Sequence, residues 1–468
     1  MPPPLALCLT IGFVAFLFWR DARERIAVSR ALWIPILWIL VTGSRFPSQW
    51  MTLGVKTFPY PEEGSPVDAI YFFSLMLLGA YVLSQRRVTL AEFARNNRWL
   101  VVFLLYCLLA IFWSDDPFVA VKRWVKILAH PIMVLVVLTD PNPIEAVKRF
   151  IKRTAYILVP FSILFIKYYP EYGRGFDSWT GLGFNQGVNL NKNELGYCCL
   201  IFGLFFFWNT LQSFKIKDRM VRRSEVILNL AFLGMVWWLL KLASSATSLV
   251  CLLLGMATIL VLGLPFVNRK YVGIYVLIGL VLFAIAEPIF GIYSHALQVL
   301  GRDATLTDRT SVWHDALKMQ PDPLIGAGFE SFWLGKRLQK LWETYWWRPN
   351  QAHNGYIETY LNLGWVGIGA LAALMIATFL KIAKDLLVRF EFARLRMAFL
   401  FAILAYNFTE ATFKGVHLVW TIFYLIAVDY PRLRAPATRM ARPPLRKSEE
   451  PLVPSASGNQ TDAFGVVN

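Results

Sequence analysis

Runs of roughly 15 to 20 apolar residues recur along the whole chain and alternate with short polar connections. Each run is long enough to be interpreted as a helix that crosses a lipid bilayer. The sequence therefore predicts an all-α, polytopic membrane protein with about 12–13 transmembrane helices, in which residues 1–430 form a single integral membrane domain. The candidate spans are 5–19, 31–42, 67–84, 99–113, 121–138, 154–167, 195–210, 226–243, 247–264, 271–290, 354–380, 397–413 and 417–430.

Lysine and arginine residues predict the orientation of these spans. Every second connection is basic, and basic connections are retained on the cytoplasmic side of a membrane. The basic connections are 20–30, 85–98, 148–153, 215–223, 269–270, 381–396 and 432–447. The other connections then face outward, and an odd number of spans places the N-terminus outside and the C-terminus inside. The outward connections are 43–66, 114–120, 168–194, 244–246, 291–353 and 414–416.

Two outward connections, 168–194 and 291–353, are too long to be simple turns, and loops of this length inside a compact fold are usually functional or disordered. The second contains helix-like stretches such as 311–319 and a tryptophan-rich segment, 342–347. Tryptophan prefers the boundary between lipid and water, so we expect short helices on the outer membrane surface. Residues 431–468 have no periodic apolar face, which predicts a disordered cytoplasmic tail.

The composition supports a membrane protein and limits the classes of partner that we expect. Apolar residues make up 57% of the chain and charged residues 16%, against about 25% charged residues in a typical soluble protein. The net charge of +17 fits basic connections that face anionic lipid, so membrane lipid is an expected partner and nucleic acid is not. A basic tunnel for a phosphate-bearing substrate is the alternative that composition leaves open. The five cysteines lie in apolar runs without Cys-x-x-Cys spacing, which predicts neither disulfides nor a metal site.

The stretch that begins at His353 has the strongest candidate chemistry. His353, Tyr356, Gly364 and Gly367 are spaced by three, four or a multiple of such steps, which places them on one face of a helix. The glycines would let a neighbouring helix approach closely. An imidazole can accept a proton from a hydroxyl near neutral pH, so His353 is a candidate catalytic base, with Asn354 as a polar neighbour. The alternative is a histidine that only bonds loop backbone at a helix end.

Arginines in the late outer loop are candidates for binding phosphate. Arg302 and Arg309 lie in the segment 301–313, and a guanidinium can pair with two phosphate oxygens at once. Salt bridges to Asp303 or Asp308 are the alternative.

Other polar residues lie where outer connections enter spans. Lys192 could neutralise phosphate, and Asn191 and Asn193 could bind sugar hydroxyls; helix capping is the alternative for this group. Lys241 precedes a small-residue turn, 244–248, and could instead extend toward the membrane surface. We reject a metal site at Asp115–Asp116, because adjacent aspartates diverge on a helix and no partner cluster accompanies them.

Two polar residues, Asn407 and Glu410, interrupt the apolar run 397–413. They are costly in lipid, so we expect both to face the interior of the helix bundle. A transporter of lipid-linked sugar would be expected to show paired halves with matched broken helices, and no such internal symmetry is visible in the sequence.

With these segments assembled, the chain resembles the O-antigen ligase and Wzy-type polysaccharide polymerase superfamily, and most closely its exopolysaccharide-polymerase branch. The segments that carry the resemblance follow the family's order between about residue 100 and residue 415. They are 113–117 with Lys122–Arg123, 191–196, 244–248, 307–313 and 353–356 with Gly364 and Gly367.

The resemblance implies transfer of undecaprenyl-diphosphate-linked oligosaccharide units at the periplasmic face of a bacterial inner membrane, by metal-independent inversion and without a cofactor. The family's essential histidine falls on His353 and its loop arginine on Arg309, where Asp308 replaces a glycine. A further family arginine falls on Ala246, so Lys192, Lys241, Arg174 or Arg302 would have to bind the diphosphate instead.

The partners implied by the resemblance are a lipid-linked glycan donor and a glycan or lipid-core acceptor. A chain-length regulator of the polysaccharide export system is a further candidate. A ligase that attaches glycan to lipid A–core or protein, and a lipid-linked sugar flippase, stay open as alternatives.

Overall fold

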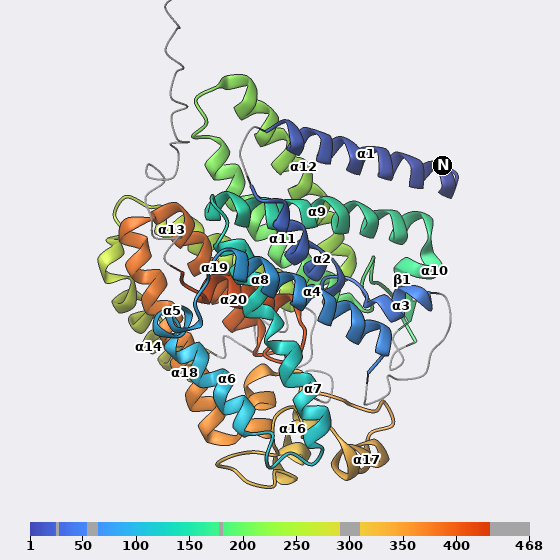
Figure 1. Cartoon of the computed structure of the whole chain (residues 1–468), viewed down its shortest axis with the longest axis vertical. Coiled ribbons are helices and arrows are strands. Elements are labelled where there is room, and N and C mark those ends of the chain that lie inside the picture. The colour runs from blue at the N-terminus through green and yellow to red at the C-terminus, as the bar shows by residue number, and fades with distance from the viewer. Residues whose placement is uncertain (25–27, 54–63, 177–180, 291–308, 431–468) are drawn as a thin grey trace, which may run out of the picture. The chain divides into compact units, whose positions relative to one another are not determined.

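The computed structural model describes residues 1–24, 28–53, 64–176, 181–290 and 309–430 (Figure 1). Regular structure in these residues is almost entirely helical. The predicted tail, 431–468, and the candidate residue Arg302 lie outside the described residues. The helices and strands are α1 (Pro3–Arg23), η1 (Arg30–Leu32), α2 (Trp33–Thr42), α3 (Pro47–Met51), α4 (Pro66–Gln85), α5 (Leu90–Asn96), α6 (Arg98–Leu109), α7 (Pro117–Ile127), α8 (Ala129–Leu138), α9 (Pro143–Tyr168), α10 (Pro170–Gly173), β1 (Arg174–Phe176), β2 (Gly183–Asn185), α11 (Lys192–Ser213), α12 (Arg219–Ala243), α13 (Ala246–Leu262), η2 (Arg269–Tyr271), α14 (Val272–Phe290), α16 (Arg309–Lys318), α17 (Gly335–Thr344), α18 (Gly355–Val388), α19 (Phe390–Tyr406) and α20 (Leu418–Ala427).

The prediction of a polytopic, mostly helical membrane protein is confirmed. Among the described residues, 6 helical segments are long and apolar enough to cross a membrane: α1, α4, α11, α12, η2 with α14, and α18. Shorter apolar helices cover η1 with α2, α6, α13 and α20. The long spans are fewer than the 12–13 expected, because several predicted spans are interrupted or end early.

Two predicted spans are interrupted in the structure, and the first has a visible local cause. The predicted span 121–138 is divided into α7 and α8 at Leu128. Pro131 has no N–H to donate to the carbonyl of Ile127, so the helical hydrogen-bond ladder is broken there. The predicted span 397–413 ends as a helix at Tyr406, and residues 407–417 form a non-helical loop between α19 and α20.

A third interruption lies inside α18, at Gly364. This glycine has φ 63° and ψ −164°, so α18 consists of two helical parts joined by a break. The backbone N–H groups of Trp365 and Val366 bond the carbonyls of Pro323 and Leu324 instead of continuing the helix. The expectation that one helical face runs unbroken from His353 to Gly367 is therefore wrong, and the close neighbour at Gly364 is a loop backbone, not a helix.

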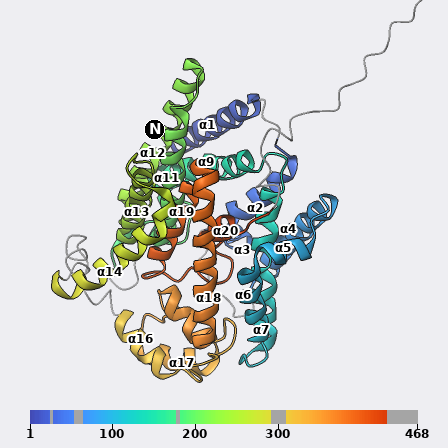
Figure 2. The ribbon, with the colours of Figure 1, turned by 90° about the vertical axis from the view of Figure 1, so that its left-hand side faces the viewer.

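The interior of the bundle is formed by α11, α19 and α20. All ten residues of α20 are buried, and most residues of α11 and α19 are buried as well. Figure 2 shows α18 running alongside α19, with α16 and α17 beside one end of α18. By contrast, the side chains of α14 that the structure describes are mostly exposed, as expected of a helix that faces lipid.

The long connections carry structure of their own. In 168–194, β1 and β2 pair antiparallel with Gly175 opposite Phe184, a small departure from the all-α prediction. In the late loop, α16 begins at Arg309, two residues before the predicted start. Trp342 and Trp347 pack partly into an apolar cluster inside this loop, whereas Trp346 is exposed. Thus only part of the tryptophan-rich segment is available to a membrane surface.

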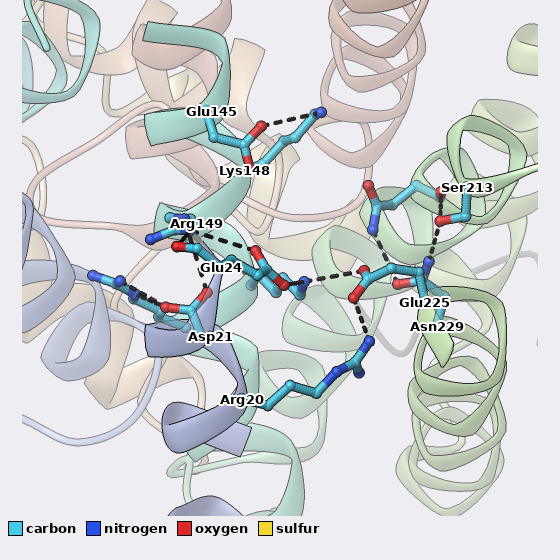
Figure 3. Close-up of polar contacts among 12 residues, drawn as sticks. Arg20, Asp21, Glu24, Glu145, Lys148, Arg149, Ser213, Glu225 and Asn229 are labelled. Atoms are coloured by element: carbon cyan, nitrogen blue, oxygen red, sulfur yellow. Dashed lines mark hydrogen bonds and ion pairs between the residues drawn. The ribbon is translucent and has the colours of Figure 1, made fainter. Parts of the chain in front are cut away.

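A network of charged side chains joins α1, α9 and α12 near the basic connections (Figure 3). Asp21 is buried and its Oδ2 lies 2.6 Å from Arg153 Nη2. Lys152 Nζ lies 3.5 Å from Glu24 and 3.2 Å from Glu225, and Arg20 also pairs with Glu225. Arg149 completes the network with Glu24 at 3.4 Å. Four cations and three carboxylates therefore neutralise one another almost completely between three helices.

Asp21→Asn is expected to destabilise the protein by about 3 kcal/mol, because it removes the buried carboxylate that is the counter-ion of the partly buried Arg153 guanidinium. The matched control is Glu145→Gln in the more exposed Glu145–Lys148 pair, which should cost at most about 1 kcal/mol. Thermal unfolding of the purified variants in detergent, followed by tryptophan fluorescence, measures both. Equal unfolding temperatures for the two variants would contradict a buried ionic network.

Gly364→Ala should destabilise the protein by several kcal/mol, because a Cβ there would overlap the carbonyl of Leu324 and the positive φ is unfavourable for alanine. Gly369→Ala in the same helix is the control, since a Cβ there meets no atom within 4 Å and alanine favours helix. The yield and thermal stability of membrane-extracted protein distinguish the two. A Gly364→Ala variant as stable as the control would argue against the break in α18.

Candidate active site

The carboxylate of Glu410 is the point at which several distant segments meet. It lies in the loop 407–417, and its side chain is 12% exposed. Its Oε2 is 3.3 Å from His353 Nδ1, and its Oε1 is 3.2 Å from Arg309 Nη2. Asn193 Nδ2 donates a further hydrogen bond to Oε1 at 2.8 Å. Glu410 therefore joins α11, α16 and the start of α18.

The loop that carries Glu410 is fixed to the N-terminus of α18. Gly355 N donates to the carbonyls of Asn407 and Glu410 at 2.8 and 3.1 Å. This approach requires glycine, because a Cβ at Gly355 would overlap the side chain of Asn407. The Asn407 amide oxygen in turn accepts bonds from the N–H and hydroxyl of Thr412. The expectation that Asn407 and Glu410 face the interior agrees with their burial.

His353 is held in a strained backbone conformation just before α18. Its φ is 49°, in the left-handed region that a histidine seldom adopts. Asn354 stabilises it: its amide oxygen caps the N–H groups of Tyr356 and Ile357, and its Nδ2 donates to the carbonyl of Phe408. The structure thus gives Asn354 a capping position beside the imidazole.

The imidazole of His353 has one ring nitrogen directed toward Glu410, and its other ring nitrogen is available to a ligand. An ionised carboxylate can only accept, so Nδ1 carries the proton when His353 is neutral. Gln351 Nε2 is 3.4 Å from the same Nδ1. Nε2 makes no hydrogen bond to any residue that the structure describes, and the side chain is 24% exposed. Nε2 can therefore accept a proton from a bound hydroxyl.

Arg309 begins α16 and is held at two points. Nη1 donates to the carbonyl of Thr409, and Nη2 pairs with Glu410. A guanidinium has five N–H groups, so these contacts leave further donors for a ligand. The Thr409 hydroxyl lies 2.8 Å from that of Thr247, which brings the small-residue turn 244–248 to the same place.

Glu410 is ionised despite its burial. Burial alone would raise the pKa of this carboxyl, but the hydrogen bond and charge of His353, together with Arg309, hold the pKa below its usual range. Glu410 lies outside the helical spans, in the loop after α19. Since its pKa is depressed, the stabilisation that it contributes is present at neutral pH and is lost as the pH falls into the acidic range.

The remaining predicted site residues are distributed around this cluster. Asn191 caps α11 by accepting from Glu194 N, so the capping alternative holds for this residue. Tyr356 donates to the carbonyl of Leu404 and packs on Phe408. Arg174 lies on β1 and donates to the carbonyl of Ile166, and Lys241 is exposed on α12. Lys192 is half-buried at the start of α11, next to Asn193.

A second polar group lies beside the same loop and was not predicted as part of a site. Glu358 Oε2 accepts from Trp333 Nε1 at 3.0 Å and from Ala352 N at 2.9 Å, and Lys414 is 3.7 Å from Oε1. Ala352 is adjacent to His353, so Glu358 fixes the backbone on the other side of the imidazole. Glu358 and Lys414 line a narrow cavity with Glu330, Phe413 and Trp420.

The role of Glu410 was missed because its only signal in the sequence was a carboxylate in an apolar run. Arg123, which lies in a segment that carries the family resemblance, donates to the carbonyl of Glu330, a residue that lines the narrow cavity. Among the residues that the structure describes, no group of three or more His, Cys, Asp or Glu side chains could hold a metal ion.

These features define a polytopic membrane protein with a histidine, an arginine and a buried carboxylate gathered where loops enter the bundle. Residues 228–372, which include Arg309 and His353, match the family model described as O-Antigen ligase. The chain is also 24% identical over 354 residues to ExoQ of Rhizobium meliloti (strain 1021), described as an exopolysaccharide production protein. That similarity covers 72% of this chain and 76% of the relative. The predicted resemblance to the O-antigen ligase family is confirmed.

Glu410→Gln should lower activity on the order of 10²-fold, because a neutral amide supports neither a protonated imidazole nor the guanidinium of Arg309. Glycan product is measured in cells or membranes at matched protein levels. The control is Glu171→Gln, an exposed carboxylate in the connection 168–194, which should leave product unchanged. Normal product from Glu410→Gln would contradict a functional role for this carboxylate.

Proposed function

We propose that the protein is a membrane glycosyltransferase of polysaccharide biosynthesis, which polymerises or transfers oligosaccharide units carried on undecaprenyl diphosphate. The observation that carries the proposal is the single buried carboxylate shared by His353 and Arg309. It places a potential base and a permanent cation in one site. The match to the O-antigen ligase family model and the similarity to an exopolysaccharide production protein support the same class of reaction and a lipid-linked glycan substrate.

The reaction is a single displacement at the anomeric carbon of the donor. His353 Nε2 takes the proton of the acceptor hydroxyl, whose oxygen forms the new bond to the anomeric carbon. The bond between that carbon and the diphosphate oxygen breaks with inversion, and the diphosphate leaves with the electron pair. Remaining N–H groups of Arg309 stabilise the charge on this leaving group, and no metal is required.

Glu410 is proposed as a positioning residue for the base. Before reaction it accepts from Nδ1–H, which leaves Nε2 aimed at the substrate. After proton transfer it lies beside an imidazolium, so its negative charge stabilises the product of the proton transfer. Asn193 bonds Glu410, so we propose that it and the adjacent Lys192 contact the sugar and the diphosphate. Asn191, Lys241 and Arg174 are proposed as more distant contributors.

The proposed location is the bacterial inner membrane, with this site at the periplasmic face. The basic connections that build the network of Asp21 and Arg153 are then cytoplasmic. A ligase that uses lipid A–core or protein as acceptor is the second candidate within the same reaction class.

His353→Ala should abolish product while the protein stays in the membrane, because it removes the imidazole Nε2 that would accept the proton of the acceptor hydroxyl. Arg309→Lys should retain the positive charge but lose bidentate geometry, and activity should fall by about 10²-fold. Glycan chain length is measured with purified protein and lipid-linked oligosaccharide. Product of normal length from His353→Ala would refute its assignment as base.

The same assay separates the alternatives. Longer glycan on the lipid carrier indicates a polymerase, glycan on an added lipid core or protein indicates a ligase, and movement of lipid-linked sugar across vesicles without bond formation indicates a flippase. The donor and each acceptor are supplied separately, so the acceptor that is consumed identifies the reaction.

A further inference from the structure

A cavity of about 190 Å³ is lined in part by residues of two basic connections, 85–98 and 381–396. It is formed where α5 ends and α6 begins, against the C-terminal half of α18, and Figure 1 shows these three helices next to one another. Its lining contains three cations and no carboxylate. The lining residues are Arg95, Asn96, Arg98, Trp99, Leu100, Leu374, Ala377, Thr378 and Lys381.

The two arginines of this cavity are not used by the fold. Arg95 and Arg98 are exposed, and neither makes a hydrogen bond or ion pair with the residues that the structure describes. This contrasts with Arg149 and Arg153, which pair with the carboxylates of Glu24 and Asp21. Lys381 is fixed instead by Asn97 Oδ1 at 3.0 Å and the carbonyl of Ala427 at 3.2 Å. The cavity lining therefore carries a net positive charge, and its lysine is held in place by hydrogen bonds.

The backbone adds to this positive potential. Both polar atoms of the Asn97 side chain are occupied by Phe93, Asp429 and Lys381, so Asn97 does not cap α6. The first N–H groups of α6 consequently have no side-chain cap, and a helix N-terminus favours an anion. This effect is secondary to the arginines.

The remaining wall is apolar. Leu100, Leu374 and Ala377 face the cavity, and the Thr378 hydroxyl is turned away into a bond with the carbonyl of Leu374. Trp99 is 48% exposed at the mouth, where an amphipathic ring suits the level of lipid headgroups. Since α6 and α18 are apolar helices of the membrane domain, a ligand here would have its charged group at the arginines and a hydrocarbon part along these helices.

From this juxtaposition we propose that the cavity binds one anionic phospholipid. Arg95 and Arg98 hold the phosphate, Lys381 adds a third positive charge, and an acyl chain lies against Leu374 and Ala377. Basic pockets between membrane helices are suited to such headgroups. The site is separate from Glu410 and does not depend on the proposed glycosyl transfer.

Native mass spectrometry of the full-length protein tests the proposal. Purified protein is supplied with phosphatidylglycerol or phosphatidylcholine, and bound lipid is counted after mild detergent removal. Wild-type protein should retain phosphatidylglycerol in preference to phosphatidylcholine. Arg95→Gln with Arg98→Gln should reduce retained phosphatidylglycerol by about tenfold or more.

The matched control is Arg219→Gln with Arg223→Gln, which removes the same charge from exposed arginines of another basic connection. This control should retain the lipid. Equal loss in both double variants, or equal retention of the two lipids by wild-type protein, overturns the site; the second comparison needs no variant to fold. Displacement of the lipid by free glycerol 3-phosphate would assign the cavity to a soluble phosphate ester and overturn the lipid proposal.

Discussion

The structure around the candidate site depends on one buried carboxylate that has to be satisfied. Glu410 is ionised in an environment where an unpaired charge would be severely unfavourable, so its partners are constrained as strongly as the carboxylate itself. Those partners are Arg309, His353 and Asn193, from three separate parts of the chain. Satisfying Glu410 therefore brings the start of α16, the start of α18 and the start of α11 together.

The same constraint explains why strain is tolerated at His353. A non-glycine residue in the left-handed region costs on the order of 1–3 kcal/mol. The next residue, Asn354, offsets this cost. Its side chain caps α18 and donates a hydrogen bond to the loop that carries Glu410. Relaxing φ at His353 would move the imidazole away from the carboxylate. The strained turn and the orientation of Nε2 are therefore two consequences of one arrangement.

The sequence predicted the helices well and their interruptions poorly. Apolar runs identify buried or lipid-facing helices because burial acts on whole segments, which is why α12, α13 and α14 lie close to their predicted spans. The break at Gly364 depends on a loop backbone about 40 residues earlier, and no local pattern encodes that contact. Motifs in the sequence identified His353 and Arg309 as candidates. The contact that joins them is made by Glu410, which is 57 residues from His353 and 101 residues from Arg309, so no local pattern predicts it.

A shared carboxylate also imposes a compromise on the proposed chemistry. The negative charge of Glu410 lies beside the imidazolium that forms when His353 accepts a proton, and the two opposite charges attract each other. The same negative charge offsets part of the positive charge of Arg309 and repels a diphosphate that approaches this arginine. Binding the donor therefore needs positive charge beyond Arg309, whereas deprotonating the acceptor does not. A site built on Glu410 would therefore need additional cations, such as Lys192, where the donor diphosphate binds. The function of those cations would be substrate binding and not proton transfer.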